Sequence, residues 1–383
     1  MQRVCSVRLQ PDHEETYVVS GFSRTPGEEH VESGFSRTAI AGRTPNADRH
    51  FLIVRLGSLG DVIHGIPAAA ALRCAYPHAR VDWLVDPRYV ELLNLVECID
   101  RRVPFDPRDL LRGGTGAWAV VRELRRTKYD AVIDLQGLLK SAVLSRLVRA
   151  EQTIGFPRSH LREPLARLFY TQTPDPGSAS HVIDKNLSLV AAVGVVDRTV
   201  RFPVAIPRTP TVTLARERVG AAEYALINPC AAWPNKRWPP ARFGAVAAAI
   251  HRDFGLRSLV LWGPGEESLA DAVVAASAGG AETAPPTTIT DLVGLARGAR
   301  LMVSGDTGPL HIAGAVGTPI VALFGPTFPE RNGPWSPRDV VVSRVSQCSC
   351  RYERRCHNAA PCIDDISVSE VCDAVGRRLV AHG

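Results

Sequence analysis

Short apolar runs alternate with amphipathic segments along most of the chain, and this alternation forms two series. The apolar runs are typical of buried strands and occupy residues 51–54, 80–85 and 131–135 in the first series, and 224–228, 258–262, 301–304 and 320–324 in the second. Segments with helical spacing lie at 61–76, 116–126, 138–149, 241–254, 267–276, 289–297 and 309–316. Strands that alternate with helices in this way predict mostly parallel sheets covered by helices on both faces.

A Pro-rich passage at residues 202–210 separates the two series. We therefore predict an α/β protein with two Rossmann-like, doubly wound domains that face each other across a cleft, where such folds bind ligands. The predicted parts are a disordered tail (1–50), an N-terminal domain (51–205), a linker (206–210), a C-terminal domain (211–345), and a Cys-rich segment with a C-terminal helix (346–383). The tail is polar and repeats Ser-Gly-Phe-Ser-Arg-Thr at 20–25 and 33–38.

The turn between the first strand and the first helix contains candidate chemistry. It reads Arg-Leu-Gly-Ser-Leu-Gly-Asp, and its glycines permit a tight turn before a helix N-terminus that can face an anion. Asp61 lies in the first helical turn, where a carboxylate can simply cap the helix. The alternative is that Asp61 acts as a general base at the mouth of the cleft.

Two further strand, loop, helix junctions lie in the second series. Lys236 follows the strand at 224–228 in a loop that precedes a helix, a good position for neutralising a diphosphate. The loop after the strand at 301–304 offers the amides of Thr307 and Gly308 to a phosphate and the carboxylate of Asp306 to a sugar hydroxyl. His311 follows in the next helix, and a lone histidine there is more often structural than a ligand.

Composition and charge narrow the classes of function. With 45% hydrophobic residues and a net charge of +6, the chain can bury two cores and is not expected to bind nucleic acid. Basic side chains outnumber acidic ones between residues 101 and 167, which indicates either an anionic partner or a solvated helix face. Among the 45 basic residues only four are lysines, and these are Lys128, Lys140, Lys185 and Lys236. Since lysine and arginine are not interchangeable in a site, each lysine is of interest.

The chain shows no membrane-spanning pattern. Residues 1–50 lack an apolar signal segment, and the longest uncharged stretch, residues 307–329, is interrupted by prolines and glycines. We expect a cytoplasmic protein without a transmembrane segment, whose contact with a membrane would be peripheral.

Four cysteines gather near the C-terminus, and they are Cys348, Cys350, Cys356 and Cys362. Their spacing differs from the paired C-x2-4-C halves of familiar zinc sites, and disulfides are disfavoured in the cytoplasm. A bound metal, a redox function and unlinked thiols in a C-terminal loop all remain open.

Several motifs together resemble a known family. The set comprises RLGSLGDVIHGIPA, DLQGLLKSA, REPLARLFY, NKRWP, WGPGEE and SGDTGPLHIAGAVGTPIVALFGPT. In this order and over residues 51–345, it is similar to the ADP-heptose:lipopolysaccharide heptosyltransferases, glycosyltransferase family nine. DLQGLLKSA and REPLARLFY resemble heptosyltransferase I in particular, which adds the first heptose to Kdo on lipid A. The resemblance implies the GT-B fold, with the acceptor on the N-terminal domain and the ADP-sugar on the C-terminal domain.

The resemblance also implies roles for individual residues. Asp61, in G-D-V-x-H, would be the catalytic base, and Lys236, in K-x-W-P, would bind the donor phosphates and favour the departure of ADP. Asp306, Thr307, Gly308 and His311 would hold the heptose and the diphosphate.

The remaining positions concern adenosine and the acceptor. Glu266 would bind the adenosine ribose, with Glu267 as an alternative register. Lys140 and Arg162, together with Ser58 and Gly60, would lie on the acceptor side, where Kdo-lipid A docks at the inner face of the inner membrane. No D-x-D pair occurs on a suitable loop, so we expect no cofactor and no required divalent metal.

Three alternatives remain at this stage. Heptosyltransferase I usually carries two threonines ahead of the K-x-W-P lysine where Ala231 and Ala232 stand here, and Cys-rich C-terminal segments are commoner in other branches. Heptosyltransferase II, or a family member with a different acceptor, is therefore the first alternative. A nucleotide-sugar epimerase of similar architecture and a non-catalytic nucleotide-binding module are the others.

Overall fold

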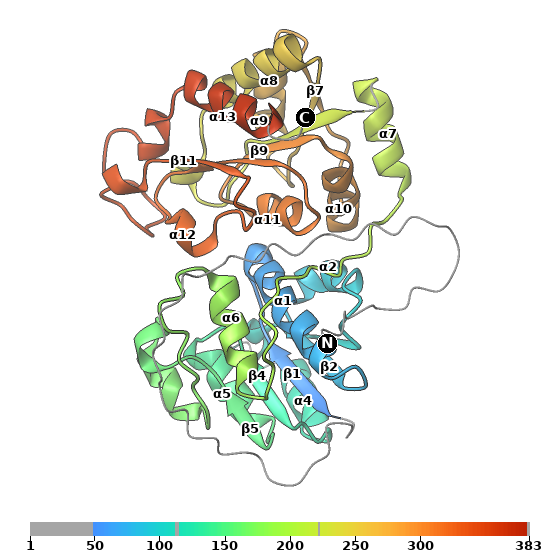
Figure 1. The fold of residues 1–383 in the computed structure, drawn as a ribbon, viewed down its shortest axis with the longest axis vertical. Helices are drawn as coiled ribbons and strands as arrows, with labels where there is room; N and C mark the ends of the chain where they lie inside the picture. Colours follow the sequence, from blue (N-terminus) through green and yellow to red (C-terminus); the bar gives the residue numbers. More distant parts are fainter. Residues whose placement is uncertain (1–48, 112–114, 221–222, 381–383) are drawn as a thin grey trace.

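The computed structural model describes residues 49–111, 115–220 and 223–380, and it contains two α/β units stacked one above the other (Figure 1). The predicted tail lies outside these residues except for its last two. Each unit has one sheet, and every strand pairing within the two sheets is parallel.

The N-terminal sheet has five strands in the order β3-β2-β1-β4-β5. Its strands are β1 (His50–Val54), β2 (Arg80–Val85), β3 (Arg101–Pro104), β4 (Ala131–Asp134) and β5 (Gln152–Ile154). The helices of this unit are α1 (Leu59–Ala75), α2 (Val90–Asn94), α3 (Pro107–Leu111), α4 (Thr115–Leu124), α5 (Leu139–Leu147) and α6 (Val182–Ala191). In β1 the last four residues are fully buried, because helices cover both faces of the sheet.

The C-terminal sheet has six strands in the order β11-β10-β9-β6-β7-β8. Its strands are β6 (Tyr224–Asn228), β7 (Arg257–Val260), β8 (Ala281–Thr283), β9 (Leu301–Gly305), β10 (Ile320–Phe324) and β11 (Val340–Ser343). The helices are α7 (Pro210–Val219), α8 (Pro240–Phe254), α9 (Glu267–Ala275), α10 (Ile289–Gly298), α11 (Gly308–Ala315), α12 (Pro329–Asn332) and α13 (Val368–Val380). Within the described residues, no helix has the length and apolar character needed to cross a bilayer.

The C-terminal helix α13 completes the second unit. It packs on α8 and beside β11, and its Arg378 donates to the buried carboxylate of Asp339 with an N to O distance of 2.8 Å. Asp339 also accepts from the backbone N–H of Ile320, so this ion pair ties α13 to the start of β10.

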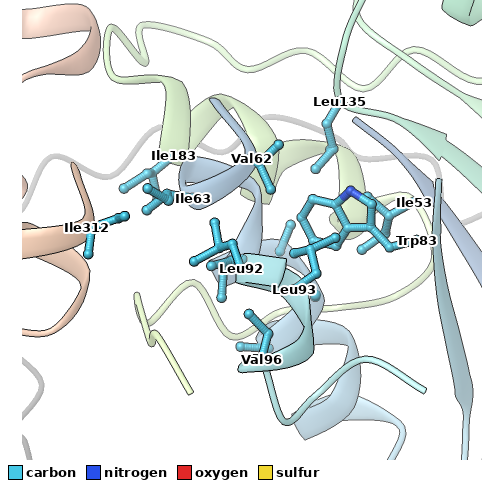
Figure 2. Packing of buried hydrophobic residues seen from close by; sticks show 14 of the residues in the cluster. Ile53, Val62, Ile63, Trp83, Leu92, Leu93, Val96, Leu135, Ile183 and Ile312 are labelled. Atoms are coloured by element: carbon cyan, nitrogen blue, oxygen red, sulfur yellow. The ribbon is translucent and has the colours of Figure 1, made fainter. Parts of the chain in front are cut away.

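The two units meet through a continuous apolar contact. Figure 2 shows Ile312 of α11 reaching towards Ile63 of α1 and Ile183 of α6. All three side chains are almost fully buried and belong to one hydrophobic cluster that spans both units. The N-terminal ends of α1 and α11, which both follow Gly-rich loops, are thereby held next to each other.

Candidate active site

Asp61 lies in the first turn of α1, where its carboxylate caps the helix and is partly exposed. Ser58 precedes α1, and Oδ2 of Asp61 accepts from the Ser58 backbone N–H (3.1 Å) and from its hydroxyl (3.0 Å). Oδ1 lies 2.5 Å from the guanidinium of Arg55, a buried residue at the end of β1. The Asp61 side chain nevertheless remains 28% exposed. The carboxylate is therefore held in one orientation and remains partly accessible to solvent.

The charge state of Asp61 follows from these contacts. Burial raises its pKa, but the charge of Arg55, the hydrogen bonds from Ser58 and the charge of Arg331 together lower the pKa below its ordinary value. Arg331 belongs to α12 of the other unit, so a charge of the C-terminal unit also acts on this carboxyl. Asp61 is thus a carboxylate throughout the neutral pH range.

Lys236 lies at the end of a short 3-10 turn, Pro234–Lys236, in the loop after β6. Its ammonium is 2.5 Å from Oδ2 of Asp306 and lies 4.6 Å from the ring centroid of Trp233. The Lys236 side chain is 13% exposed and that of Asp306 only 5%. A buried, paired lysine with one aromatic neighbour is a fixed positive charge at the edge of the sheet.

Asp306 is the centre of a dense polar cluster after β9. Besides Lys236, it accepts from the Thr327 hydroxyl (2.7 Å) and from the Asn332 side-chain amide (2.8 Å), and His311 lies 3.5 Å away. Burial raises the pKa of Asp306, but the His311 hydrogen bond and the Lys236 charge lower it far more. Because its oxygens are occupied by protein donors, Asp306 positions Lys236 and the loop around it.

The N-terminus of α11 faces the first unit. The Thr307 hydroxyl accepts from the Asn228 amide at 2.9 Å, and a Cβ at Gly308 would lie 2.6 Å from Cδ2 of Leu59 in α1. The buried ring of His311 packs edge-on against His64 of α1 with centroids 4.5 Å apart. Lys236, Asp306, Thr307, Gly308 and His311 are therefore brought together, opposite the helix that begins beside Asp61.

Comparison with known proteins identifies the family. A family model described as Glycosyltransferase family 9 (heptosyltransferase) matches residues 117–361. The chain belongs to glycosyltransferase family 9. Lipopolysaccharide heptosyltransferase 1 of Pseudomonas aeruginosa is 30% identical over 320 residues, which cover 80% of this chain and 86% of that protein. The chain is thus a glycosyltransferase, and the epimerase and the non-catalytic module are set aside.

Solved structures of the family confirm the predicted fold. The structure of E. coli heptosyltransferase WaaC with ADP has a TM-score of 0.68 and 25% identity, and covers 86% of this chain and 99% of that one. E. coli ADP-heptose lps heptosyltransferase II has a TM-score of 0.69 and 18% identity, with 87% and 99% covered. The two parallel-sheet domains are therefore those of the GT-B fold.

In this family-nine chain, Glu266 and Glu267 are placed differently. Glu266 precedes α9, is 26% exposed and lies 3.3 Å from the guanidinium of Arg237. Arg237 also donates to the carbonyl of Ala231 at 2.7 Å, so Glu266 is linked to the Lys236 loop. Glu267 lies in the first turn of α9 and is exposed. Of the two glutamates, Glu266 is therefore the one with a contact to the Lys236 loop.

The basic residues assigned to the acceptor lie apart from this cluster. Lys140 in α5 and Arg162 are both exposed. The backbone N–H of Leu139 donates to Glu163 at 2.7 Å, so the segments that carry the two cations run side by side. Ser58 is exposed beside Asp61, whereas Gly60 is buried against His311 of the other domain.

The C-terminal cysteines form a small cluster of their own. Cys348, Cys350 and Cys362 are buried, Cys356 packs against them, and the Sγ atoms of Cys350 and Cys356 are 3.5 Å apart. All four are free thiols, and over the described ranges no group of three or more His, Cys, Asp or Glu has a metal-binding arrangement. Asn235 donates to the carbonyl of Glu353 at 2.8 Å, so this segment packs against the Lys236 loop.

Several site residues were not predicted from the sequence. They are Arg55, Arg237, Thr327, Arg331 and Asn332. An arginine directly after an apolar strand, at the start of the Gly-rich turn, was a signal for Arg55. The last three follow β10 in Gly-Pro-Thr-Phe-Pro-Glu-Arg-Asn, another strand, loop, helix junction of the kind that was used elsewhere.

The close approach of α1 and α11 predicts how a substitution at Gly60 affects stability and activity. A Cβ at Gly60 would overlap the His311 ring, so Gly60→Ala should lower the free energy of unfolding by about 1–3 kcal/mol and reduce transferase activity. Gly376 in α13 has nothing within 4 Å of an added Cβ, and Gly376→Ala should leave activity unchanged and stability equal or higher. Denaturant midpoints and turnover check both. Wild-type stability and activity in Gly60→Ala would show that this contact is not maintained in solution.

Proposed function

We propose that this protein is an inverting heptosyltransferase that moves heptose from ADP-heptose to the Kdo region of lipid A during assembly of the lipopolysaccharide inner core. The observation that carries the proposal is the placement of Asp61 and Lys236 on opposite domains at one interdomain boundary. The relatives support the substrates: one is named lipopolysaccharide heptosyltransferase 1, and structures of WaaC hold ADP and ADP-2-deoxy-2-fluoro heptose.

The chemistry is a direct displacement at the anomeric carbon. The acceptor hydroxyl gives its proton to the Asp61 carboxylate while its oxygen forms the new bond to that carbon from the side opposite ADP. The bond between the anomeric carbon and the phosphate oxygen breaks, and ADP leaves with the electron pair. Lys236 stabilises the charge that develops on the diphosphate. The configuration at the anomeric carbon is therefore inverted.

The lowered pKa of Asp61 has two consequences for its role as the base. The carboxylate is ionised at every pH at which the cell operates, so the base is always available. It is also a weak base, so proton transfer accompanies bond formation at the anomeric carbon instead of preceding it. Domain closure around both substrates would exclude water and limit hydrolysis of the donor.

When the donor binds, the Lys236 ammonium would interact with the diphosphate as well as with Asp306. This ammonium now pairs with Asp306, and the diphosphate would approach from the partly exposed side of the lysine. Thr327 and Asn332 would still donate hydrogen bonds to the Asp306 carboxylate in the donor complex. Glu266 would accept hydrogen bonds from the adenosine ribose, and Thr307 and Gly308 would offer backbone amides to the phosphates.

We expect no divalent metal in the reaction, because the lysine provides the positive charge at the leaving group. Transfer by the purified protein should proceed at an unchanged rate in excess EDTA, measured as ADP release. A loss of activity that added Mg²⁺ or Mn²⁺ restores would contradict this.

The acceptor places the reaction at the cytoplasmic face of the inner membrane, where the protein would bind peripherally. The exposed cations Lys140 and Arg162 support an anionic lipid acceptor. Ala231 and Ala232 keep heptosyltransferase II as the second candidate, since threonines are usual at that place in heptosyltransferase I. A panel of Kdo-lipid A, heptosyl-Kdo-lipid A and other core acceptors with ADP-heptose decides between them. Transfer to heptosylated acceptors alone would overturn the first assignment.

A further inference from the structure

The short helix α12 connects the donor-side cluster to the N-terminal domain. Asn332 at its end donates to Oδ1 of Asp306 at 2.8 Å. The carbonyl of Gly333, the next residue, lies 3.1 Å from Nε2 of His181, the N-cap of α6. The α12 segment is therefore fixed between the Lys236–Asp306 cluster and the beginning of α6.

Two cations converge at this junction. Arg331 immediately precedes Asn332 and is exposed, and Lys185 lies one turn along α6 from His181 on the same face of that helix. The charge of Arg331 lowers the pKa of Lys185, as does the partial burial of the lysine. The contact between His181 and Gly333 places the two cations on neighbouring segments of opposite domains.

These two cations have no carboxylate within ion-pair distance in the part of the chain that the structure describes. Neither Arg331 nor Lys185 has an ion pair there. The Asp61 carboxylate pairs with Arg55, and the charge of Arg331 acts on it without forming an ion pair. Two nearby cations raise the electrostatic energy of this arrangement of the domains unless an anion lies between them.

We propose that Lys185 and Arg331 form a binding site for an oxyanion of the acceptor, which joins the two domains when the acceptor is bound. The site lies near Asp61, because His64, one turn along α1 from Asp61, packs edge-on against His181 with ring centroids 5.5 Å apart. The donor diphosphate belongs at Lys236. An anion held next to the base is part of the molecule whose hydroxyl the base deprotonates. The planar guanidinium can bind a carboxylate or a phosphate in bidentate fashion, and the compact ammonium adds a point charge.

This inference rests on the proposed function only for the identity of the acceptor, and binding can be tested without turnover. Calorimetric titration of the ADP-bound protein with inorganic phosphate and with free Kdo, whose charge is a carboxylate, separates the two sources of the oxyanion. We expect at least one probe to bind, and Lys185→Ala or Arg331→Ala to weaken it by about 10-fold to 100-fold. Affinity for ADP should stay within about 2-fold in both variants.

Matched controls and a double variant sharpen the test. Lys128→Ala and Arg252→Ala remove exposed cations that pair with neighbouring carboxylates away from the site, and both should bind the probes like the wild type. If one anion contacts both cations, the loss in the double variant is smaller than the product of the two single losses. In turnover, the acceptor KM should rise in both single variants while the donor KM does not.

Two results would overturn the proposal. One is that both variants bind the probes as the wild type does. The other is that the variants lose affinity for ADP instead of for the probes. If the wild type transfers no heptose yet binds a probe through Lys185 and Arg331, the proposed function fails and this site stands.

Discussion

Replacing Asp61 by alanine is expected to lower heptosyl transfer by about 10²-fold to 10⁴-fold and to leave the affinity for ADP-heptose within about 2-fold. The acceptor hydroxyl loses the group that takes its proton, whereas the donor phosphates bind to the other domain, at Lys236. Turnover with saturating substrates and calorimetric titration with the donor measure the two quantities.

A second carboxylate in the chain gives a matched control for the structural role of Asp61. Glu370 near the start of α13 accepts from the backbone N–H of Ser367 (2.8 Å) and pairs with Arg344 (2.6 Å), as Asp61 does with Ser58 and Arg55. Glu370→Ala should cost a similar amount of stability, about 1 kcal/mol, without changing kcat. Wild-type turnover by Asp61→Ala would remove Asp61 from the mechanism.

Lys236→Ala should affect both catalysis and stability. Loss of its charge at the leaving diphosphate is expected to lower kcat by about 10²-fold to 10³-fold. The same change leaves the Asp306 carboxylate, which is 5% exposed, without its nearest cation, and should cost about 3 kcal/mol of unfolding free energy. Denaturant unfolding and turnover are measured on the same preparations.

A paired substitution separates the two effects of Lys236. Lys236→Met combined with Asp306→Asn removes both charges and retains an oxygen that accepts from Thr327. Most of the lost stability should return because no unpaired charge remains, while kcat stays low. Recovery of activity together with stability would show that Lys236 acts through folding alone.

The strands that the apolar runs predicted are the central ones, and the strands that were missed are the outermost. β3, β5, β8 and β11 lie at the four edges of the two sheets. Central strands are buried on both faces and so show continuous apolar runs, as in β1 and β10. β3 reads Arg-Arg-Val-Pro and β8 reads Ala-Glu-Thr, because an edge strand is partly exposed and its sequence has no such pattern.

The candidate site was likewise predicted only in part from the sequence. The strand, loop, helix junctions pointed to Asp61, Lys236 and Asp306, since each lies between the end of a strand and the first turn of the next helix. The structure brings Lys236 and Asp306 within 2.5 Å. The contacts within the site could not be predicted. The hydrogen bond between Asp306 and Asn332 and the packing of His64 on His311 depend on how loops and domains pack. The proximity of Lys185 to Arg331 likewise requires the three-dimensional arrangement of α6 and α12.

The structure of this protein with ADP-2-deoxy-2-fluoro heptose, a donor analogue that resists transfer, tests the shared interdomain site most directly. The account predicts that the diphosphate contacts Lys236 and that the Asp61 carboxylate faces the anomeric carbon from the side opposite the phosphate. A donor bound with its sugar directed away from Asp61, or with its phosphates remote from Lys236, would contradict it.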